Sequence, residues 1–225
     1  MKILITGANG MLGTAIKAAL QEQELFCFSS KELDISCSFQ LDQKVKNIRP
    51  DYIINCAAYT AVDLAETEEE KAFKINALAV QKMAQISKQY KATFIHFSTD
   101  YVFKGDAATP YVIDQETDPI NVYGASKLAG EKAITQIGCK HYIFRISWLY
   151  APHGKNFFNW VAGTDMKELK IVDSQIGSPT SALDVAAFIH HVLKNDPTAY
   201  GAYHFTNQGA WTGLILHKRL ITSWI

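Results

Sequence analysis

Short runs of apolar and β-branched residues recur along this chain, and more polar segments separate them. Continuous apolar runs of this kind are typical of parallel strands that are buried on both faces of a sheet. The runs predict strands at Lys2–Thr6, Leu25–Phe28, Tyr52–Cys56, Thr93–Ser98 and Tyr142–Ile146.

The segments between these runs predict helices, and Gly138 provides a stop signal for the last of them. Alternating strands and helices with short loops predict an α/β fold, a doubly wound parallel sheet of the Rossmann type. The predicted helices are Thr14–Gln21, Phe39–Asn47, Glu66–Tyr90 and Val122–Gln136.

The regular alternation weakens after Trp148. We expect a short strand at Lys170–Val172, a loop at Gln175–Thr180 and a helix at Ala182–Leu193. Gly163 interrupts the helical pattern that follows Asn156, so a shortened helix is expected there.

The chain has 225 residues, 48% of them hydrophobic, which suffices for one sizeable core but not for two full domains. Residues 1–150 are therefore expected to form an NAD(P)-binding Rossmann domain. Residues 151–225 are expected to form a partial substrate lobe that is not an independent domain.

A glycine loop follows the first predicted strand directly, with glycines at positions 7, 10 and 13. A strand, a glycine loop and a helix together form the phosphate-binding corner of a dinucleotide fold. The helix start offers free N–H groups and a positive dipole end to a pyrophosphate. Glycine spacing alone is a weak signal, but its place between a strand and a helix strengthens it. The expected cofactor-binding residues are Gly7, Asn9, Gly10, Met11, Leu12 and Gly13.

The residues after the second strand bear on the choice of cofactor. An acid there would bind the 2′-hydroxyl of the adenosine ribose and select NADH. Ser30 and Lys31 offer a hydroxyl and a cation instead, which favours the 2′-phosphate of NADPH, although NADH remains possible. The alternative is that Lys31 merely points into solvent. Asp34 and Ile35 are expected to flank the adenine.

Small residues follow the third strand, where Ala57, Ala58 and Tyr59 leave room for a cofactor at the strand ends.

Asn76 is expected to have a structural role. His96 lies inside the fourth strand, and a lone histidine there is more often a hydrogen-bonded core residue than a catalyst.

Tyr123 and Lys127 are four residues apart, so on a helix they lie on one face, one turn apart. A nearby cation lowers the pKa of a phenol, and a tuned tyrosine becomes a usable general acid–base. The hydroxyl of Ser98 or Thr99, at the end of the fourth strand, could hold a substrate carbonyl against it. In isolation, such a pair is more often an ordinary surface pair, and only the glycine loop gives it context.

Lys and Arg number 22 and Asp and Glu also number 22, which argues against a nucleic-acid or anionic-membrane partner. No apolar run approaches the roughly 18 residues that span a bilayer. The cysteines at positions 27, 37, 56 and 139 lack metal-ligand spacing, so no metal site and a cytoplasmic location are expected.

Longer sequence strings carry a specific resemblance. These strings are Asn55–Glu66, Ser98–Phe103, Pro119–Gly124, Lys127–Glu131, Phe144–Tyr150 and Asp173–Thr180. On these strings the chain resembles the dTDP-4-dehydrorhamnose reductase family, within the extended short-chain dehydrogenase/reductase superfamily, from Met1 to about Gln208. General sugar epimerases share the glycines and the Tyr/Lys pair but not these strings.

The resemblance implies that NADPH reduces the C4 keto group of dTDP-4-dehydro-L-rhamnose to give dTDP-L-rhamnose, a precursor of cell-surface polysaccharide. It implies that Tyr123 protonates the alkoxide, that Lys127 tunes Tyr123 and binds the nicotinamide ribose, and that Thr99 aligns the carbonyl. A role for Mg²⁺ and a monomeric or homodimeric state both stay open. The implied sugar pocket comprises Thr60, Val62, Thr99, Asp100, Tyr101 and Trp148.

Two alternatives remain at this stage. One is a non-catalytic NADP-binding regulatory protein on the same fold, like the methionine adenosyltransferase regulatory subunit. The other is another sugar-nucleotide reductase or an epimerase, which would keep its cofactor through the catalytic cycle. Intact Thr99, Tyr123 and Lys127 favour an enzyme.

The resemblance ends near Gly209, where the family continues with a different helix start. We therefore expect a frameshift or truncation close to Ala210, which leaves open whether this shortened chain is active. Residues 210–225 are expected to pack poorly, although Leu214, Ile221 and Trp224 could share one helical face.

Overall fold

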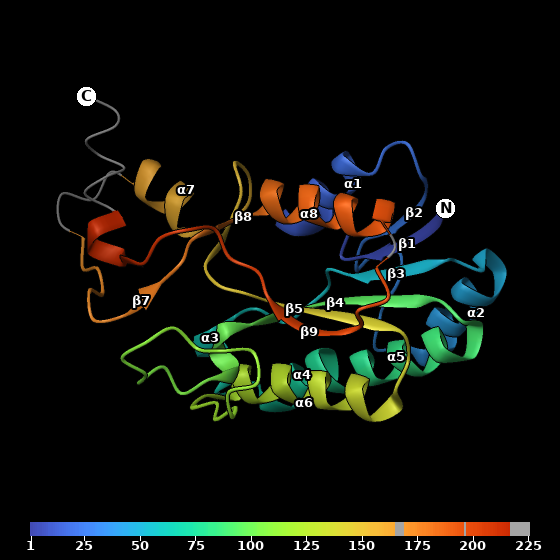
Figure 1. Cartoon of the computed structure of the whole chain (residues 1–225), viewed down its shortest axis with the longest axis horizontal. Helices are drawn as coiled ribbons and strands as arrows, with labels where there is room; N and C mark the ends of the chain where they lie inside the picture. Colours follow the sequence, from blue (N-terminus) through green and yellow to red (C-terminus); the bar gives the residue numbers. More distant parts are fainter. Residues whose placement is uncertain (165–168, 196, 217–225) are drawn as a thin grey trace.

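The computed structural model describes residues 1–164, 169–195 and 197–216. In this part of the chain the main sheet has six strands in the order β2-β1-β3-β4-β5-β9, and all neighbouring pairs are parallel (Figure 1). The predicted fold class is confirmed. The strands are β1 (Lys2–Thr6), β2 (Glu24–Phe28), β3 (Tyr52–Asn55), β4 (Thr93–Thr99), β5 (His141–Ile146) and β9 (Gly201–His204).

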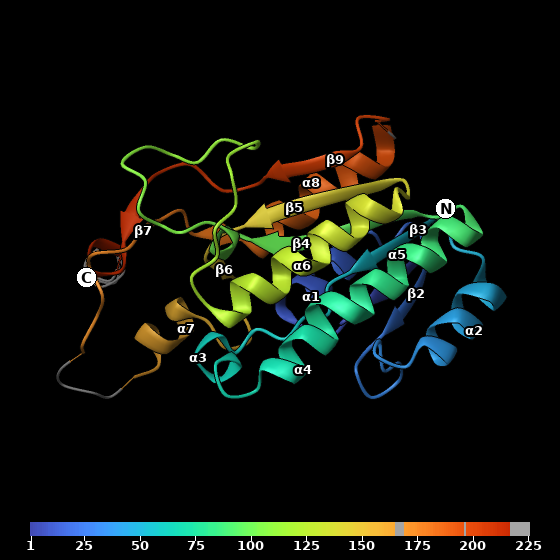
Figure 2. The same ribbon diagram turned by 90° about the horizontal axis from the view of Figure 1, so that it is seen from below.

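Helices cover both faces of this sheet. One face packs against α1 (Met11–Ala19) and α8 (Ala182–Asn195), which also contact each other. The other face packs against α2 (Ser38–Ile48), α5 (Ala79–Tyr90) and α6 (Val122–Ile137), and Figure 2 shows α5 and α6 side by side.

Alternation along β1 shows how the sequence builds two cores. Ile3 and Ile5 belong to the core under α1 and α8, whereas Leu4 belongs to the core under α2 and α5. Successive side chains of a strand point to opposite faces, so a strand covered on both faces must be apolar throughout. Strand order reverses between β1 and β3, and such a switch point opens a crevice at the carboxyl ends of the strands.

The long helix predicted for Glu66–Tyr90 is wrong in detail. A short helix, α3 (Val62–Ala65), precedes the segment, which itself forms α4 (Glu69–Phe73) and a π-helical turn, η1 (Lys74–Leu78), before α5 begins. The turn carries Asn76, whose Nδ2 donates to the Tyr59 carbonyl at 3.0 Å and whose Oδ1 accepts from Tyr59 N at 2.9 Å. The structural role expected for Asn76 is confirmed.

The segment after Trp148 forms a small lobe beside the sheet. It contains β6 (Leu149–Tyr150), α7 (Phe157–Ala162), β7 (Ile176–Gly177), β8 (Thr180–Ser181) and β10 (Trp211–Thr212). The shortened helix is confirmed by α7, which ends at Gly163.

Two expectations for this lobe are wrong. Lys170–Val172 forms no strand, and the predicted loop at Gln175–Thr180 contains β7 and the start of β8. Each of these strands is only two residues long. Pairing with partners elsewhere in the chain, rather than the local sequence, therefore determines whether they form. The sheet also extends beyond the boundary expected at residue 150, because β9 joins the edge of β5 and α8 packs on α1.

The start of the tail is packed. Trp211 and Thr212 pair antiparallel with β7, and Leu216 is buried. The prediction of poor packing is therefore wrong for Trp211, Thr212 and Leu216, whereas Ile215 is half exposed, and residues 217–225 lie outside the described part. None of the helices in the described part is long and apolar enough to cross a membrane.

Candidate active site

The end of β4 provides the first component of the site. Thr99 ends the strand, and a 3₁₀ turn, η2 (Asp100–Val102), follows at once. Thr99 Oγ1 accepts from Tyr101 N at 3.2 Å and donates to Asp100 Oδ1 at 3.1 Å. Burial raises the pKa of Asp100, while its hydrogen bonds, first that from Thr99, act in the opposite direction. The turn thereby fixes the Thr99 hydroxyl at the carboxyl edge of the sheet.

The start of α6 places Tyr123 against this turn. Asn121 caps the helix, since its Oδ1 accepts from Gly124 N at 2.7 Å. A side chain at Gly124 would collide with the Tyr101 carbonyl, so only glycine allows the helix to begin here. The rings of Tyr101 and Tyr123 meet edge to face with centroids 5.6 Å apart.

Tyr123 is protonated in this environment. Burial raises its pKa to about 12, a hydrogen bond with Thr99 acts in the opposite direction, and Asp100 adds to the rise. The expectation of a lowered pKa for Tyr123 is therefore wrong, because burial raises this pKa above that of a free phenol. Desolvation outweighs any effect of a cation, because a phenolate is costly in a buried site.

Lys127 is 2% exposed and turns toward β4. Its Nζ donates to the Phe97 carbonyl at 2.7 Å and lies 3.4 Å from His96 Nε2. Burial lowers the pKa of Lys127 to about 8, and Glu131 acts in the opposite direction. The structure thus brings Thr99 and Tyr123 together through a hydrogen bond, and it places Lys127 one turn further along α6 with its Nζ directed to Phe97 and His96.

The glycine loop fits a dinucleotide. Gly7 has φ +65°, and a side chain there would meet Ala57 N at 2.6 Å, so the loop lies against the residues after β3. Gly13 approaches the Gly7 carbonyl too closely for a side chain. A side-chain carbon at Gly10 would have only the Gly7 carbonyl near it, at 3.3 Å, so the loop leaves space on that side for a pyrophosphate. No side chain caps α1 and its first turn has no acid, so its N–H groups are available to a phosphate.

The adenosine end contains a residue that the sequence analysis missed. Glu32 Oε2 accepts from Ser29 N at 2.8 Å and from Ser29 Oγ at 2.7 Å, and these bonds lower its pKa. An acidic residue, Glu32, therefore does lie close to the end of β2, one residue beyond Lys31, although the sequence analysis found no acid there. Ser30 and Lys31 are exposed, as a 2′-phosphate would require, whereas Ile35 is buried and Asp34 accepts from Ser36.

Thr60 is exposed and Val62 half-buried, next to the tethered Tyr59. Trp148 lies at the start of the lobe and adopts a left-handed backbone with φ 45°. A side chain at Gly177 would meet the indole at 2.5 Å, so this glycine makes room for the ring. Gly177 is a second residue whose part sequence reasoning missed, because only its close approach to the Trp148 indole reveals it.

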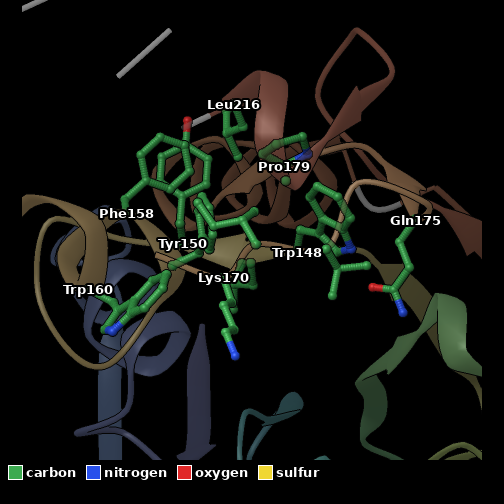
Figure 3. A pocket seen from close by; sticks show the side chains of 13 residues that line it. Trp148, Tyr150, Phe158, Trp160, Lys170, Gln175, Pro179 and Leu216 are labelled. Atoms are coloured by element: carbon green, nitrogen blue, oxygen red, sulfur yellow. The ribbon is translucent and has the colours of Figure 1, made fainter. Parts of the chain in front are cut away.

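A cavity of about 370 Å³ lies in the lobe. Figure 3 shows Tyr150, Phe158 and Trp160 on one side of it and Trp148 with Gln175 on the other. Of the predicted site residues, Trp148 alone lines this cavity, and Thr99, Tyr123 and Lys127 do not. Within the described ranges, no three His, Cys, Asp or Glu side chains are grouped to hold a metal ion.

The glycine loop, the parallel sheet and the Tyr–Lys pair define a nucleotide-binding fold of the short-chain dehydrogenase/reductase class. A family profile described as "RmlD substrate binding domain" matches residues 1–223. The chain belongs to this family.

Similar proteins of known name support this family assignment. The chain is 40% identical to a dTDP-4-dehydrorhamnose reductase of Escherichia coli K12 over 94% of its own length and 74% of that protein. The corresponding protein of Burkholderia thailandensis is 36% identical over 100% and 78% of the two lengths.

Solved structures agree as well. A dTDP-4-dehydrorhamnose reductase from Bacillus anthracis in complex with NADP has a TM-score of 0.95 and 39% identity, and the match covers 99% of this chain and 80% of that one. A UDP-glucose 4-epimerase of Thermus thermophilus has a TM-score of 0.86 at 18% identity, over 99% and 83% of the two chains, which shows a shared fold.

Proposed function

We propose that this chain reduces the C4 keto group of dTDP-4-dehydro-L-rhamnose with NADPH, forming dTDP-L-rhamnose. The observation that carries the proposal is the hydrogen bond between Thr99 and Tyr123, one turn before the buried Lys127 on α6, in a fold that also has an open glycine loop. The names of relatives that share 36–40% identity support the same substrate.

The cofactor is held by the glycine loop and the residues after β3. Gly7, Gly10 and the start of α1 would receive the pyrophosphate, with Asn9, Met11 and Leu12 around it. Ala57, Ala58 and Tyr59 would line the cofactor beyond β3. When bound, NADPH supplies a hydride to the carbonyl carbon, and the protein must supply the proton.

Tyr123 would supply this proton. Reduction leaves negative charge on the substrate oxygen, and a phenol whose pKa is raised to about 12 is protonated at neutral pH and ready to donate. Thr99 would hold the carbonyl oxygen against Tyr123. The buried Lys127 would meet the cofactor ribose and the phenolate that proton donation leaves behind.

The lobe would hold the sugar nucleotide. Trp148, Tyr101 and Asp100 would contact the sugar, and Thr60 and Val62 would border it from the β3 side. The 6-methyl face of a deoxysugar is apolar, and an aromatic wall suits it. The aromatic cavity next to Trp148 supports placing the remainder of the substrate in the lobe.

Ser30 and Lys31 support a preference for NADPH over NADH. The negative charge of Glu32 would disfavour a 2′-phosphate and so opposes this preference. The hydrogen bonds from Ser29, however, direct the Glu32 carboxylate toward the loop that follows β2. We propose that NADPH is preferred and that NADH is also used.

The test is NADPH oxidation on addition of dTDP-4-dehydro-L-rhamnose, with NADH in a parallel assay. We expect stoichiometric dTDP-L-rhamnose and release of NADP⁺ at each turnover. Tight NADPH binding without any oxidation would identify a non-catalytic binding protein instead. Retention of the cofactor throughout the cycle would identify an epimerase.

A further inference from the structure

A buried polar chain runs from β1 to Lys127 and contains His96. Thr6 Oγ1 donates to Asn55 Oδ1 at 2.6 Å, and Asn55 Nδ2 lies 3.1 Å from His96 Nδ1. His96 Nε2 lies 3.4 Å from Lys127 Nζ. All four side chains are at most 2% exposed, so each contact forms away from solvent. The sequence analysis treated His96 as a core residue.

The hydrogen-bond partners of Asn55 determine which nitrogen of His96 carries the proton. Asn55 Oδ1 already accepts from Thr6 Oγ1 and from Ala57 N, the latter at 3.1 Å. The amide nitrogen of Asn55 therefore faces His96 as a donor, and His96 Nδ1 must accept. Burial, aided by Lys127, lowers the pKa of His96 well below its ordinary value, so the ring is neutral. Its single proton is then on Nε2, which faces Lys127.

This arrangement discriminates between the two forms of Lys127. An ammonium group offers only donors, so it meets the Nε2–H of His96 donor against donor. A neutral amine has a lone pair that can accept this N–H while one of its own N–H groups bonds to the Phe97 carbonyl.

The other charged groups near Lys127 do not reverse this preference. Glu131 lies one turn further along α6 and favours the ammonium form, but its carboxylate is already bound by Arg145 of β5 at 2.7 Å. Tyr123 lies one turn before Lys127 and is neutral, since its pKa is raised.

We propose that His96 is a positioning residue that favours the neutral amine of Lys127 over its ammonium form, by presenting a fixed Nε2–H to the lysine nitrogen. The idea rests on the proposed function, in which Lys127 acts beside Tyr123. A negative group beside Lys127, such as the Tyr123 phenolate, shifts this balance back toward the ammonium form, because an opposite charge favours the charged form. Before turnover, Tyr123 stays fully protonated as the acid.

The test follows Lys127 directly by NMR in ligand-free protein with ¹³Cε-labelled lysine, and loss of one signal in Lys127→Arg assigns it. In the wild-type chain we expect a titration midpoint near pH 8. In His96→Leu the opposing N–H is lost, and in His96→Gln a carbonyl oxygen can face Lys127. Both should raise the midpoint by about one pH unit or more.

Ser87→Ala serves as the control, because it removes a buried hydroxyl that donates to Met83 O in α5 and should leave the midpoint unchanged. A wild-type Lys127 that titrates at the ordinary lysine value would overturn the proposal without any variant. So would an unchanged or lowered midpoint in whichever His96 variant folds.

The alkaline limb of the pH profile of NADPH oxidation should move in the same direction as the midpoint. The NMR titration needs no substrate, so it decides the role of His96 even if the proposed reaction is not observed. A purely structural role for His96 would lower thermal stability and leave both pH profiles in place.

Discussion

The sheet half and the lobe of this protein are built in different ways. All seven residues of β4 are buried, and β3 is buried throughout. In the lobe the strands are two residues long, α7 has no buried residue, and Ile176 is 74% exposed. The sheet half therefore fixes its chemical groups by dense packing, whereas the lobe fixes Trp148 by a few specific contacts.

Those few contacts are identifiable. Ser147 Oγ donates to Ser178 O at 2.7 Å, and Thr180 N donates to Trp148 O at 3.2 Å. Ser178 Oγ in turn donates to Gly209 O at 2.7 Å, which ties the start of the tail to the lobe. Substitutions in the sheet half should therefore change chemistry and cofactor binding, and substitutions in the lobe should change substrate affinity.

The largest effect is expected for Tyr123→Phe, which removes the proposed proton donor and keeps the ring. General acid catalysis contributes about 10²–10⁴-fold, so kcat should fall by this factor while the Kd for NADPH hardly changes. Steady-state kinetics and calorimetry measure the two. Tyr90→Phe, on the far end of α5, is the matched control. Near-normal kcat in Tyr123→Phe would remove Tyr123 from the mechanism.

The next effect concerns stability. The pKa of Lys127 is lowered to about 8 in the folded chain, whereas an unfolded chain has a lysine pKa of about 10.4. Between these two pH values the unfolded state therefore binds a proton that the folded state does not. The free energy of unfolding therefore falls as pH decreases from 10.4 to 8 and stays reduced below that. Lys127→Met should remove this cost and stabilise the protein by up to about 3 kcal/mol at pH 7.

Urea unfolding at a series of pH values measures this stabilisation, which should vanish near pH 10.4. The control is Lys132→Met, an exposed lysine on the same helix. A stabilisation that is equal at all pH values would argue for packing and against a buried amine.

A third effect separates folding from binding. Gly10→Val introduces a branched side chain where only the Gly7 carbonyl lies near, so the unliganded chain should keep its melting temperature. The side chain would occupy the space for the pyrophosphate, and the Kd for NADPH should rise at least about tenfold, or 1.4 kcal/mol. In calorimetric titration, the Kd of Gly10→Ala for NADPH should lie between those of the wild-type chain and Gly10→Val. An unchanged Kd in Gly10→Val would exclude the loop from cofactor binding.

The smallest effect is expected in the lobe. Gly177→Ala places a methyl group against the Trp148 indole, and relief of such a contact costs about 1–3 kcal/mol. The KM for the sugar nucleotide should rise, whereas the Kd for NADPH should stay constant. A parallel loss of NADPH affinity would show that the lobe and the sheet half are not separable as described.

Sequence alone predicts the elements that local pattern determines. The strands from β1 to β5 were found because apolar runs specify buried parallel strands, and α6 was found with its stop at Gly138, which has φ +65°. The π-turn at Asn76 was missed, because its cause is the tether to Tyr59 rather than any residue pattern. Likewise β9 was missed, since Gly201–His204 becomes a strand only at the free edge of β5.

The same division applies to the site. The predicted Thr99 and Tyr123 meet, and Lys127 follows one turn later, because the fold fixes a strand end and a helix start. The pKa of Tyr123 was misjudged because spacing shows the nearby cation but not the extent of burial. Glu32 and Gly177 were missed because their parts depend on contacts with Ser29 and Trp148.

The parallel pairing of β6 with β8 has a consequence for protein engineering. Leu149 lies opposite Thr180, and Tyr150 opposite Ser181, so both ends of the intervening segment leave the body of the protein side by side. Doubling the length of a closed loop costs only about 0.6 kcal/mol. A change of length between residues 151 and 179 should therefore be tolerated where it keeps Ala151 in the core and preserves the contacts of Gly177 and Ser178 with the rest of the lobe.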